Sequence, residues 1–501
     1  MPSLPPSLPR VCVALGFASP DELTRATEHE YKDGNSFLEY RLDYLEHPSE
    51  GAGVIRHFRE KYPDLKILGT CRATAHGGHF KGSLGSQISL LAEAAEAGAV
   101  ALDLEIESAE RVKCAVPTLR ALSSIIISYH NFQRTPAFDP ILRRLKRFAA
   151  DAYKVVTTAR KPKDHLRLAR FVADNCPTTP LIAFCMSETG TPTRILSPSF
   201  GCIYTYAAPA ANEGTAPGQI SAREMRSLYR CDKLTRQSRI YGIIADPVHH
   251  TKSPAIHNRA FQARRVDAVY VPFLVPSAYL GEWMNVASPL GVSGFSVTIP
   301  HKQRILRYLD TIEPLAKRIG AVNTVWRKAG KWRGTNTDAE GVVQPLSRHI
   351  RLAHASVLVA GYGGGARAAA IALSDAGARL TITGRDLRRA STLARTAKGE
   401  AISLQDAEKQ RYDALVHATP VGMFPHSNET LFSDRIPADV VLDMVYNPHE
   451  TVLLAHAREQ GCTLIYGSEM LLAQAARQFE IWTGEPAPRS VMQNALEAIP
   501  D

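Results

Sequence analysis

The sequence predicts an α/β protein in which a (β/α)8 barrel is followed by two further α/β domains. Three observations support this fold class. The chain has 501 residues, too many for a single hydrophobic core. Short apolar runs alternate with amphipathic stretches up to about residue 230. Farther along, an apolar run leads through a glycine-rich turn into an alanine-rich stretch, the pattern of a strand, a tight turn and a helix.

The composition narrows the classes of function. The net charge is +10, and 45% of residues are hydrophobic and 22% charged, as in an ordinary globular protein. No apolar run approaches the ~20 residues that span a bilayer, and the N-terminal residues lack the features of a signal peptide. The basic residues are dispersed, and their densest cluster, residues 143–147, resembles a solvated helix face. We expect no membrane or nucleic-acid partner, and small anionic substrates instead.

The cysteines indicate a reducing compartment. All eight are scattered, with no Cys-x-x-Cys pair and no spacing typical of a metal site. Several, such as Cys12, Cys185 and Cys202, lie in apolar runs. We therefore expect reduced thiols in a cytoplasmic protein without a bound metal. Nothing in the sequence predicts the oligomeric state.

Eight apolar runs define the predicted strands of the barrel. They are residues 11–16, 37–44, 66–71, 100–106, 124–130, 152–157, 180–186 and 202–207. Helical patterns such as residues 86–97 and 164–174 lie between most of them. Repeated βα units give parallel strands, and eight such units close into a barrel. Catalytic side chains are then expected at the carboxyl ends of the strands.

Polar residues gather at those predicted strand ends. They are Glu39, Arg41, Arg72, His130 and Arg194. In addition, Lys154 lies inside the sixth apolar run, where a cation is costly to bury. Such a lysine is either paired with a carboxylate in the core or used as an amine nucleophile. His130 at the same mouth favours amine catalysis, because desolvation and nearby arginines favour the neutral, nucleophilic amine.

The first 230 residues resemble the type I 3-dehydroquinate dehydratases over nearly their whole length. The matching positions are Glu39, Arg41, Asp43, residues 70–72, residues 128–132, Tyr153, Lys154, Arg194 and residues 216–219. The resemblance implies that Lys154 forms an iminium with a substrate ketone. It also implies that His130 removes the proton beside the iminium carbon and helps the C1 hydroxyl leave. The iminium acts as an electron sink, so the carbanion becomes an enamine.

The same resemblance assigns the substrate contacts. Arg194 clamps the substrate carboxylate with its bidentate fork, and Gln219 lies on a loop that closes over the site. Glu39 and Arg41 bind ring hydroxyls and tune the lysine. The full implied set is Glu39, Arg41, Arg72, Arg194, Thr215 and Gln219.

Two positions depart from the family pattern. His76 precedes Gly77 and Gly78 where the family usually has glutamate, and Thr215 stands where serine is usual. Neither change removes the amine or the base. The first leaves one substrate contact open.

A glycine-rich turn follows the apolar run 357–360 in the second half of the chain. The turn contains Gly361, Gly363, Gly364, Gly365 and Ala366. Gly361 permits a tight turn, and Gly363 lets the backbone approach a pyrophosphate that the helix N-terminus stabilises. A plain strand-to-helix turn is the alternative. The flanking strand and alanine-rich helix favour a Rossmann dinucleotide-binding unit.

The next predicted strand, residues 379–383, indicates which dinucleotide binds. An acidic residue at its end favours NAD, because it bonds the ribose hydroxyls. Here Arg385, Arg388 and Arg389 dominate, which favours the 2′-phosphate of NADP. Asp386 keeps NAD open as the alternative.

Residues 239 to about 498 resemble the shikimate dehydrogenases. The matching positions are Thr251, Ser253, Pro254, Thr298, Pro300, Lys302 and residues 321–324, 336–338, 418–423 and 469–474. The resemblance implies that Lys302 and Asp338 form a catalytic dyad, which handles the hydroxyl proton as hydride moves to or from the nicotinamide. The implied substrate contacts are Thr251, Ser253, Thr298, Asn323, Tyr446, Gln474 and Gln478. The implied cofactor contacts are Gly361, Gly363, Gly364, Gly365, Ala366, Arg385, Arg388, Thr419, Met423 and Gly467.

Local patterns in this region leave some alternatives. Pro300 just before His301 and Lys302 predicts a strand-to-helix boundary, which places Lys302 at a helix start. The alternative is an ordinary surface lysine. The usual Ser-x-Ser of the family is Thr251-x-Ser253 here, and Ser296 replaces its usual asparagine. Thr251 adds a methyl group beside the substrate carboxylate, which is expected to disfavour quinate.

Together the resemblances predict a domain order. We expect a dehydratase barrel at residues 1–230, a substrate-binding domain at 239–340, a Rossmann NADP-binding domain at 341–466 and returning helices at 467–501. This order resembles the bifunctional enzymes of plants and some bacteria. It implies dehydration of 3-dehydroquinate to 3-dehydroshikimate, then NADPH-dependent reduction to shikimate. The alternatives are a quinate-preferring second half and a non-catalytic regulator, which should have lost the reactive groups.

Overall fold

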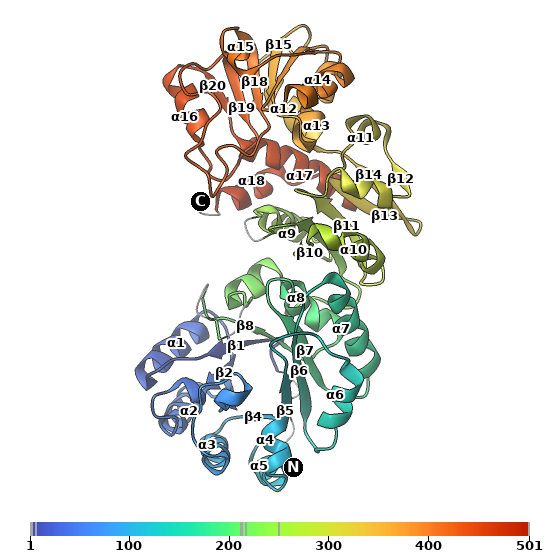
Figure 1. Cartoon of the computed structure of the whole chain (residues 1–501). Helices are drawn as coiled ribbons and strands as arrows, with labels where there is room; N and C mark the ends of the chain where they lie inside the picture. The colour runs from blue at the N-terminus through green and yellow to red at the C-terminus, as the bar shows by residue number, and fades with distance from the viewer. Residues whose placement is uncertain (1–3, 6–7, 211–213, 216–217, 249–250, 499–501) are drawn as a thin grey trace. The chain divides into compact units, whose positions relative to one another are not determined.

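The computed structural model describes residues 4–5, 8–210, 214–215, 218–248 and 251–498. The chain divides into two compact units (Figure 1). The first contains residues up to 240 together with 267–275 and 281–291, and the second contains the remainder. The four domain boundaries expected from the sequence remain predictions.

Eight parallel strands in the first unit form a nearly closed barrel, which confirms the predicted architecture. They are β1 (Val11–Leu15), β2 (Phe37–Arg41), β3 (Lys66–Thr70), β4 (Ala101–Glu105), β5 (Ser124–His130), β6 (Ala152–Thr158), β7 (Leu181–Met186) and β8 (Thr205–Ala207). Hydrogen bonds join them in the order β7-β6-β5-β4-β3-β2-β1-β8. The ring closes where the Ile203 amide, just before β8, donates to the Leu181 carbonyl of β7 at 3.0 Å.

Helices surround these strands (Figure 1). They are α1 (Pro20–Lys32), α2 (Glu50–Lys61), α3 (Leu84–Glu96), α4 (Ile106–Arg111), α5 (Ala115–Leu122), α6 (Phe138–Leu145), α7 (Pro162–Asn175) and α8 (Thr191–Phe200). The two helical patterns named from the sequence fall within about two residues of α3 and α7. Sequence signals set the start of α1, where the Ser19 hydroxyl accepts from the Glu22 amide at 3.3 Å and Pro20 occupies the first turn.

The second predicted strand is too long by three residues. It ends at Arg41, and Leu42–Tyr44 form a short 3-10 helix. The Arg41 guanidinium donates to both carboxylate oxygens of Asp43, at 2.9 and 2.7 Å, and these bonds stabilise the turn. Arg41 therefore stands at the mouth of the barrel.

Alternate residues of each strand point into the barrel. The interior core contains Cys12, Ala14, Phe37, Leu68, Ala101, Ile126, Ala152, Val156, Ile182, Phe184, Met186, Tyr204 and Tyr206. On β6, Ala152 and Val156 belong to this core, and Lys154 lies between them on the same face. Strand periodicity thus directs the lysine into the barrel rather than towards the outer helices.

One sheet of the second unit has the strand order β9-β11-β13-β14-β12. These strands are β9 (Arg239–Ala245), β11 (Val292–Val297), β13 (Thr324–Lys328), β14 (Lys331–Thr335) and β12 (Thr311–Ile312). The nearby helices are α9 (Ser253–Ala263), α11 (Pro314–Ile319) and α12 (Asp338–Leu346), whereas β10 (Ala268–Leu274) and α10 (Leu280–Ala287) come between α9 and β11 in the sequence. The antiparallel register of β11 and β13 pairs Ser296 with Thr324.

The other sheet is parallel, in the order β17-β16-β15-β18-β19-β20. Its strands are β15 (Ser356–Ala360), β16 (Arg379–Thr383), β17 (Glu400–Ala401), β18 (Tyr412–His417), β19 (Ala438–Asp443) and β20 (Thr463–Ile465). The helices are α13 (Gly364–Asp375), α14 (Leu387–Thr396), α15 (Leu404–Glu408) and α16 (Val452–Glu459), followed by α17 (Gly467–Thr483) and α18 (Arg489–Glu497). Strand β15, the glycine turn and α13 confirm the Rossmann unit. Helix α17 packs against α12, β11 and β13.

Lys302 does not begin a helix, contrary to the sequence-based expectation. It lies in a turn, and the helix that follows is a 3-10 helix over Arg304–Tyr308. The Lys302 carbonyl accepts a hydrogen bond from the Val322 amide at 2.8 Å. This carbonyl is therefore bonded to a neighbouring segment and not to a helical turn. The lysine is therefore held in place by the neighbouring segment.

Among the described residues, no helix is both long and apolar enough to cross a membrane. All eight cysteines are free.

Two candidate active sites

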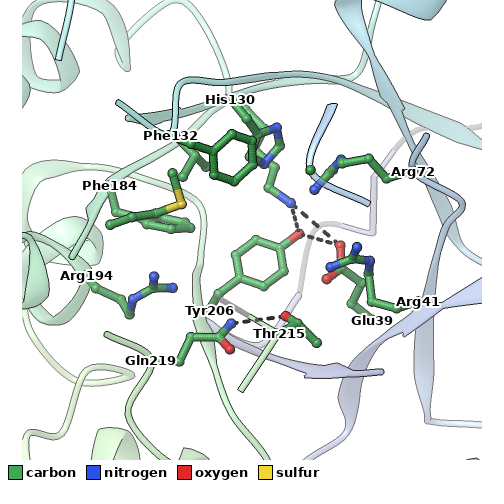
Figure 2. A pocket seen from close by; sticks show the side chains of 14 residues that line it. Glu39, Arg41, Arg72, His130, Phe132, Phe184, Arg194, Tyr206, Thr215 and Gln219 are labelled. Carbon is green, nitrogen blue, oxygen red and sulfur yellow. Dashed lines mark hydrogen bonds and ion pairs between the residues drawn. The ribbon is translucent and has the colours of Figure 1, made fainter. Parts of the chain in front are cut away.

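A small cavity of about 50 Å³ opens at the carboxyl ends of the barrel strands (Figure 2). It brings together all eight dehydratase residues expected from the sequence. They are Glu39, Arg41, Arg72, His130, Lys154, Arg194, Thr215 and Gln219. Strand ends that are far apart in the sequence converge there because the strands are parallel. Of the expected motif, Ala216 and Pro217 lie outside the described residues.

Lys154 is surrounded by acidic and phenolic oxygens. Its Nζ donates to Asp103 Oδ2 at 3.0 Å and to the Tyr206 hydroxyl at 2.8 Å. It also forms an ion pair with Glu39 Oε1 at 3.6 Å. The side chain is 3% exposed and lines the cavity. The lysine is therefore paired with carboxylates, as one of the two sequence-based alternatives expected, and it also faces the cavity, as a nucleophile would have to.

Asp103 holds the positive charges of the site together. Its Oδ1 accepts from Arg72 at 2.8 Å and from Ser128 at 2.6 Å. Burial alone raises the pKa of Asp103, but the cations of Lys154 and Arg72 outweigh it and lower that pKa below its ordinary value. The carboxylate is therefore ionised and is a poor proton acceptor.

His130 is the last residue of β5 and lies close to these charges. Burial, followed by the nearby cations of Arg72 and Lys154, lowers its pKa well below the ordinary value. The imidazole is therefore neutral near pH 7 and has a lone pair available to accept a proton. A base next to a buried amine suits the abstraction of a proton beside a carbonyl-derived carbon.

Arg194 is a buried cation that lacks a full set of partners. It is 1% exposed, and neither Nε nor Nη2 has a hydrogen-bond partner among the described residues. Its guanidinium lies 4.4 Å from the ring centroid of Phe184, and burial lowers its pKa to about 10. An unpaired buried guanidinium is costly. Its donors are suited to the carboxylate of a bound ligand.

The loop residues and the departures from the family pattern have clear positions. Gln219 Nε2 lies 3.5 Å from Thr215 Oγ1 (Figure 2). His76 ends the 3-10 helix Thr74–His76 and does not line the cavity, whereas the adjacent Gly77 does. The sequence left open whether His76 contacts the substrate. In this structure the His76 side chain does not line the cavity and supplies no such contact.

Two residues of this site were missed from the sequence. Asp103 is a charge on the inward face of an apolar run, the same signal that identified Lys154, so it was available. Tyr206 carried no comparable signal, because a tyrosine in an apolar strand usually contributes to the core.

A larger cavity of about 710 Å³ lies in the second unit. It brings together every substrate contact expected for this half and most of the cofactor contacts. The expected residues that line it are Thr251, Ser253, Thr298, Lys302, Asn323, Asp338, Gly363, Gly364, Gly365, Thr419, Met423, Tyr446, Gly467, Gln474 and Gln478. The expected cofactor contacts Gly361, Ala366, Arg385 and Arg388 do not line it.

The lysine and aspartate of the expected dyad are in direct contact. Lys302 Nζ lies 2.5 Å from Asp338 Oδ2, and Asn323 Nδ2 donates to Asp338 Oδ1 at 2.8 Å. Asp338 is the first residue of α12, where the helix dipole favours its negative charge. Ammonium, carboxylate and amide groups thus converge on one wall of the cavity.

The neighbouring polar residues orient one another. Gln478 accepts from the Ser296 hydroxyl at 2.8 Å and donates to Thr324 Oγ1 at 3.0 Å. Asn323 also approaches Gln474 Oε1 at 3.4 Å. Burial raises the pKa of Tyr446, so its phenol is neutral at physiological pH. The serine that replaces the usual family asparagine is therefore integrated into a buried network.

The glycine turn fits a dinucleotide. Gly361 has φ of +124°, which favours glycine, and a Cβ there would lie 2.8 Å from the Ala418 carbonyl. At Gly363, an added Cβ would meet nothing within 4 Å, so this part of the turn is open to a ligand. Gly363, Gly364 and Gly365 line the cavity at the start of α13, where backbone amides favour phosphate.

The residues after β16 bear on the choice between NADP and NAD. Asp386 caps α14, and its Oδ1 accepts from the Arg388 and Arg389 amides at 3.0 and 3.2 Å. This carboxylate is therefore engaged as a cap. Arg385 and Arg388 are exposed, and Arg389 lies over the Tyr362 ring at 4.5 Å. Exposed guanidinium groups at this position suit a 2′-phosphate.

A buried chain of hydrogen bonds supports Thr419. His417 Nε2 is 2.6 Å from Thr419 Oγ1, and His417 Nδ1 is 2.8 Å from Asp443 Oδ1. The Thr451 hydroxyl donates to the other oxygen of Asp443 at 2.6 Å. Sequence reasoning identified Thr419 alone, because its partners stand at the ends of β18 and β19.

The first cavity is typical of (β/α)8 lyases that use an amine, and the second is typical of nicotinamide-dependent dehydrogenases. Residues 11–236 match the family model of type I 3-dehydroquinase. Residues 243–325 match the shikimate dehydrogenase substrate binding domain, and residues 467–497 match the shikimate 5′-dehydrogenase C-terminal domain. The chain belongs to the bifunctional 3-dehydroquinate dehydratase/shikimate dehydrogenase family, and its cofactor is NADP.

Individual relatives agree with this assignment. The chloroplastic bifunctional 3-dehydroquinate dehydratase/shikimate dehydrogenase of Arabidopsis thaliana is 34% identical over 513 residues, covering 97% of this chain and 83% of the relative. The shikimate dehydrogenase (NADP(+)) of Thermosynechococcus vestitus is 40% identical over 279 residues, covering 53% and 97%. A solved shikimate dehydrogenase in complex with NADP+ has a TM-score of 0.50 at 36% identity, covering 52% of this chain and 96% of that one.

Proposed function

We propose that Lys154 forms the Schiff base with 3-dehydroquinate in the first active site. The supporting observation is a buried amine within the barrel, beside a neutral imidazole and an incompletely paired guanidinium. His130 then takes the proton beside the iminium carbon, and its conjugate acid helps the C1 hydroxyl leave as water. The product released from the lysine is 3-dehydroshikimate.

Binding of the substrate ring uses the remaining cavity residues. Arg194 receives the carboxylate, because its Nε and Nη2 donors are unused by the described residues. Glu39 and Arg41 bind ring hydroxyls, and Arg72 contributes positive charge near the base. Thr215 and Gln219 cover the bound substrate from the loop.

In the second active site, Lys302 and Asp338 handle the proton of the substrate hydroxyl. Lys302 donates a proton to the carbonyl oxygen of 3-dehydroshikimate during reduction, and Asp338 holds the ammonium in position. NADPH, when bound, supplies the hydride. Thr298, Asn323 and Gln474 bind ring hydroxyls. The carboxylate contacts are Thr251, Ser253 and Tyr446, with Gln478 in support.

The cofactor is held by the glycine turn and by residues from neighbouring loops. Gly361 and Ala366 shape the turn without lining the cavity, whereas Gly363, Gly364 and Gly365 approach the pyrophosphate. Arg385 and Arg388 receive the 2′-phosphate. Thr419, Met423 and Gly467 line the nicotinamide side. We propose the domain boundaries 1–230, 239–340, 341–466 and 467–501 for these parts.

Borohydride trapping tests the first assignment. Reduction of the enzyme with 3-dehydroquinate should add one ligand mass to the peptide that contains Lys154, and Lys154→Ala should abolish the adduct. An adduct on another lysine would refute the role of Lys154. Steady-state kinetics with 3-dehydroquinate, 3-dehydroshikimate and quinate then tests both halves on one preparation.

The free cysteines favour a reducing compartment. On that basis we propose a cytoplasmic location. Fractionation of the source cells with an antibody to this chain tests it, and recovery in an organelle would overturn it.

A further inference from the structure

The hydroxyl of Tyr206, on β8, bridges the amine of Lys154 to the carboxylate of Glu39. Figure 2 shows Tyr206 and Glu39 side by side in the cavity. The phenolic oxygen accepts from Lys154 Nζ at 2.8 Å and donates to Glu39 Oε1 at 3.3 Å. The Tyr206 side chain is 2% exposed and lines the cavity. The three groups thus form a continuous path for a proton inside the site.

We propose that Tyr206 is a further catalytic residue of the dehydratase, which relays protons between Lys154 and Glu39 while the Schiff base forms and breaks. The proposal rests on the proposed role of Lys154. It concerns the steps before and after the chemistry assigned to His130, because iminium formation needs proton transfers of its own.

A protonated amine has no lone pair, so Lys154 must lose a proton before it attacks a ketone. Glu39 Oε1 is 3.6 Å from Nζ, beyond an ordinary hydrogen bond, whereas Tyr206 spans the gap with bonds of 2.8 and 3.3 Å. Asp103 touches the amine directly, but Arg72 and Ser128 bind its other oxygen. Its lowered pKa makes it a weak acceptor. The relay therefore leads to Glu39.

The proton balance closes over the steps. The Lys154 ammonium gives a proton to the Tyr206 oxygen as the Tyr206 proton passes to Glu39, which leaves a neutral amine and a protonated carboxyl group. The nitrogen lone pair attacks the ketone carbon, a C–N bond forms, and a proton moves from nitrogen to oxygen to give the carbinolamine. The proton on Glu39 returns through Tyr206 to the carbinolamine hydroxyl. Water leaves, and the nitrogen lone pair forms the C=N bond of the iminium.

Tyr206 remains neutral throughout. Burial, followed by the negative charge of Glu39, raises its pKa well above the ordinary value. A tyrosinate would therefore be disfavoured, and the phenol must accept one proton as it gives up another. A hydroxyl that accepts from Lys154 and donates to Glu39 can perform this concerted exchange.

Packing is the alternative role for Tyr206. Its ring lies 5.8 Å from that of Phe184 and 5.5 Å from that of Tyr204, centroid to centroid. Tyr206→Phe keeps the ring and removes only the hydroxyl, so the two roles give different results. Tyr204→Phe is the matched control, because Tyr204 is also buried and its hydroxyl lies 3.4 Å from that of Tyr206, but among the described residues it makes no hydrogen bond to Lys154 or Glu39.

The test is rapid-quench borohydride trapping with 3-dehydroquinate, followed by mass spectrometry of the Lys154 peptide. For Tyr206→Phe we expect the trapping rate to fall by roughly 10²-fold, the lower end of general acid–base effects. The primary deuterium isotope effect for substrate labelled at the abstracted position should fall towards one, because Schiff-base formation becomes slower than proton abstraction. Tyr204→Phe should keep the rate and the isotope effect of the unmodified enzyme.

A trapping rate within about twofold of the unmodified enzyme in Tyr206→Phe, with the isotope effect unchanged, would overturn the relay. An adduct elsewhere than Lys154 in the unmodified enzyme would instead refute the proposed function. If Tyr206→Phe does not fold, the unmodified enzyme supplies the answer in mixtures of H2O and D2O. A relay moves two protons together and predicts a curved dependence of the trapping rate on deuterium fraction, whereas a linear dependence would contradict it.

Discussion

Lys302 and Asp338 form an ion pair with an Nζ–Oδ2 distance of 2.5 Å, although 36 residues separate them in the chain. The Asp338 side chain is 4% exposed and that of Lys302 is 20% exposed. The carboxylate is thus enclosed, and the ammonium faces the cavity that accepts substrate and cofactor. This asymmetry suits a lysine that exchanges a proton with a substrate oxygen and a carboxylate that keeps it in place.

Replacing Lys302 should separate the two activities. We expect Lys302→Ala to lower shikimate oxidation by roughly 10²–10⁴-fold, as for loss of a general acid–base group, and to leave dehydration of 3-dehydroquinate unchanged. Parallel assays of both reactions on one preparation provide the measurement. A similar loss in both would show that the assignment of Lys302 to the second site alone is wrong.

The dehydratase should stay active below the ordinary pKa of histidine. Burial and the cations of Arg72, Lys154 and Arg41 lower the pKa of His130, whereas Asp103 raises it; the net shift is downward. The neutral form is the base, so a lowered pKa keeps more base at acidic pH. We therefore expect the acidic limb of kcat/KM to lie below pH 6.5. A limb centred above pH 6.5, in a profile of kcat/KM against pH, would contradict the assignment.

Arg194 should contribute to binding at the expense of stability. Removing a buried, incompletely paired cation relieves a desolvation cost, so Arg194→Leu should fold with an unchanged or raised Tm. The same change should lower kcat/KM for 3-dehydroquinate by roughly 10- to 150-fold, the loss expected for ~1.5–3 kcal/mol of charged hydrogen bonding. Calorimetry and kinetics on the same variant check both. A clearly lowered Tm would show that Arg194 supports the fold instead.

Arg385 should discriminate between the two nicotinamide cofactors. The Arg385→Ala variant is expected to lose roughly 10- to 150-fold in kcat/KM for NADPH and little for NADH, because only NADPH carries the 2′-phosphate. Since Asp386 caps α14, it is not expected to replace that contact by bonding the ribose. Equal losses with both cofactors would argue against a phosphate contact.

The second site should prefer shikimate to quinate. Quinate is tetrahedral at C1 and has an extra hydroxyl, whereas shikimate is planar there. Thr251 Oγ1 already accepts from the Ser253 amide at 3.3 Å, and its methyl group adds bulk beside the expected carboxylate position. An unpaired added hydroxyl costs ~1–3 kcal/mol, or roughly 5- to 150-fold. The ratio of kcat/KM for shikimate to that for quinate, with NADP at one pH, should exceed one by such a factor; a ratio at or below one would contradict it.

Local patterns predicted much of the fold, and the family resemblances supplied most of the residues expected in both sites. The eight apolar runs form barrel strands, because each parallel strand is buried on both faces, by the barrel interior on one side and by the surrounding helices on the other. Lys154 was visible as a charge in such a run, and the turn at Gly361 was visible because its φ of +124° favours glycine. The residues expected around both reactive lysines also line the two cavities, since parallel strands and the loops after them share one edge.

Contacts between distant strands were decided only by the tertiary structure. Asp103 and Tyr206 meet Lys154 across 51 and 52 residues of sequence, at 3.0 and 2.8 Å. Which groups meet inside a barrel depends on the stagger of its strands, and a one-residue shift would turn each of these side chains outward. The sequence by itself therefore indicated most of the residues that we propose to carry chemistry, but it missed Asp103 and Tyr206. The three-dimensional arrangement decided their partners, their charge states and the proton path from Lys154 to Glu39, because hydrogen bonding and desolvation act over a few ångströms in space and not along the chain.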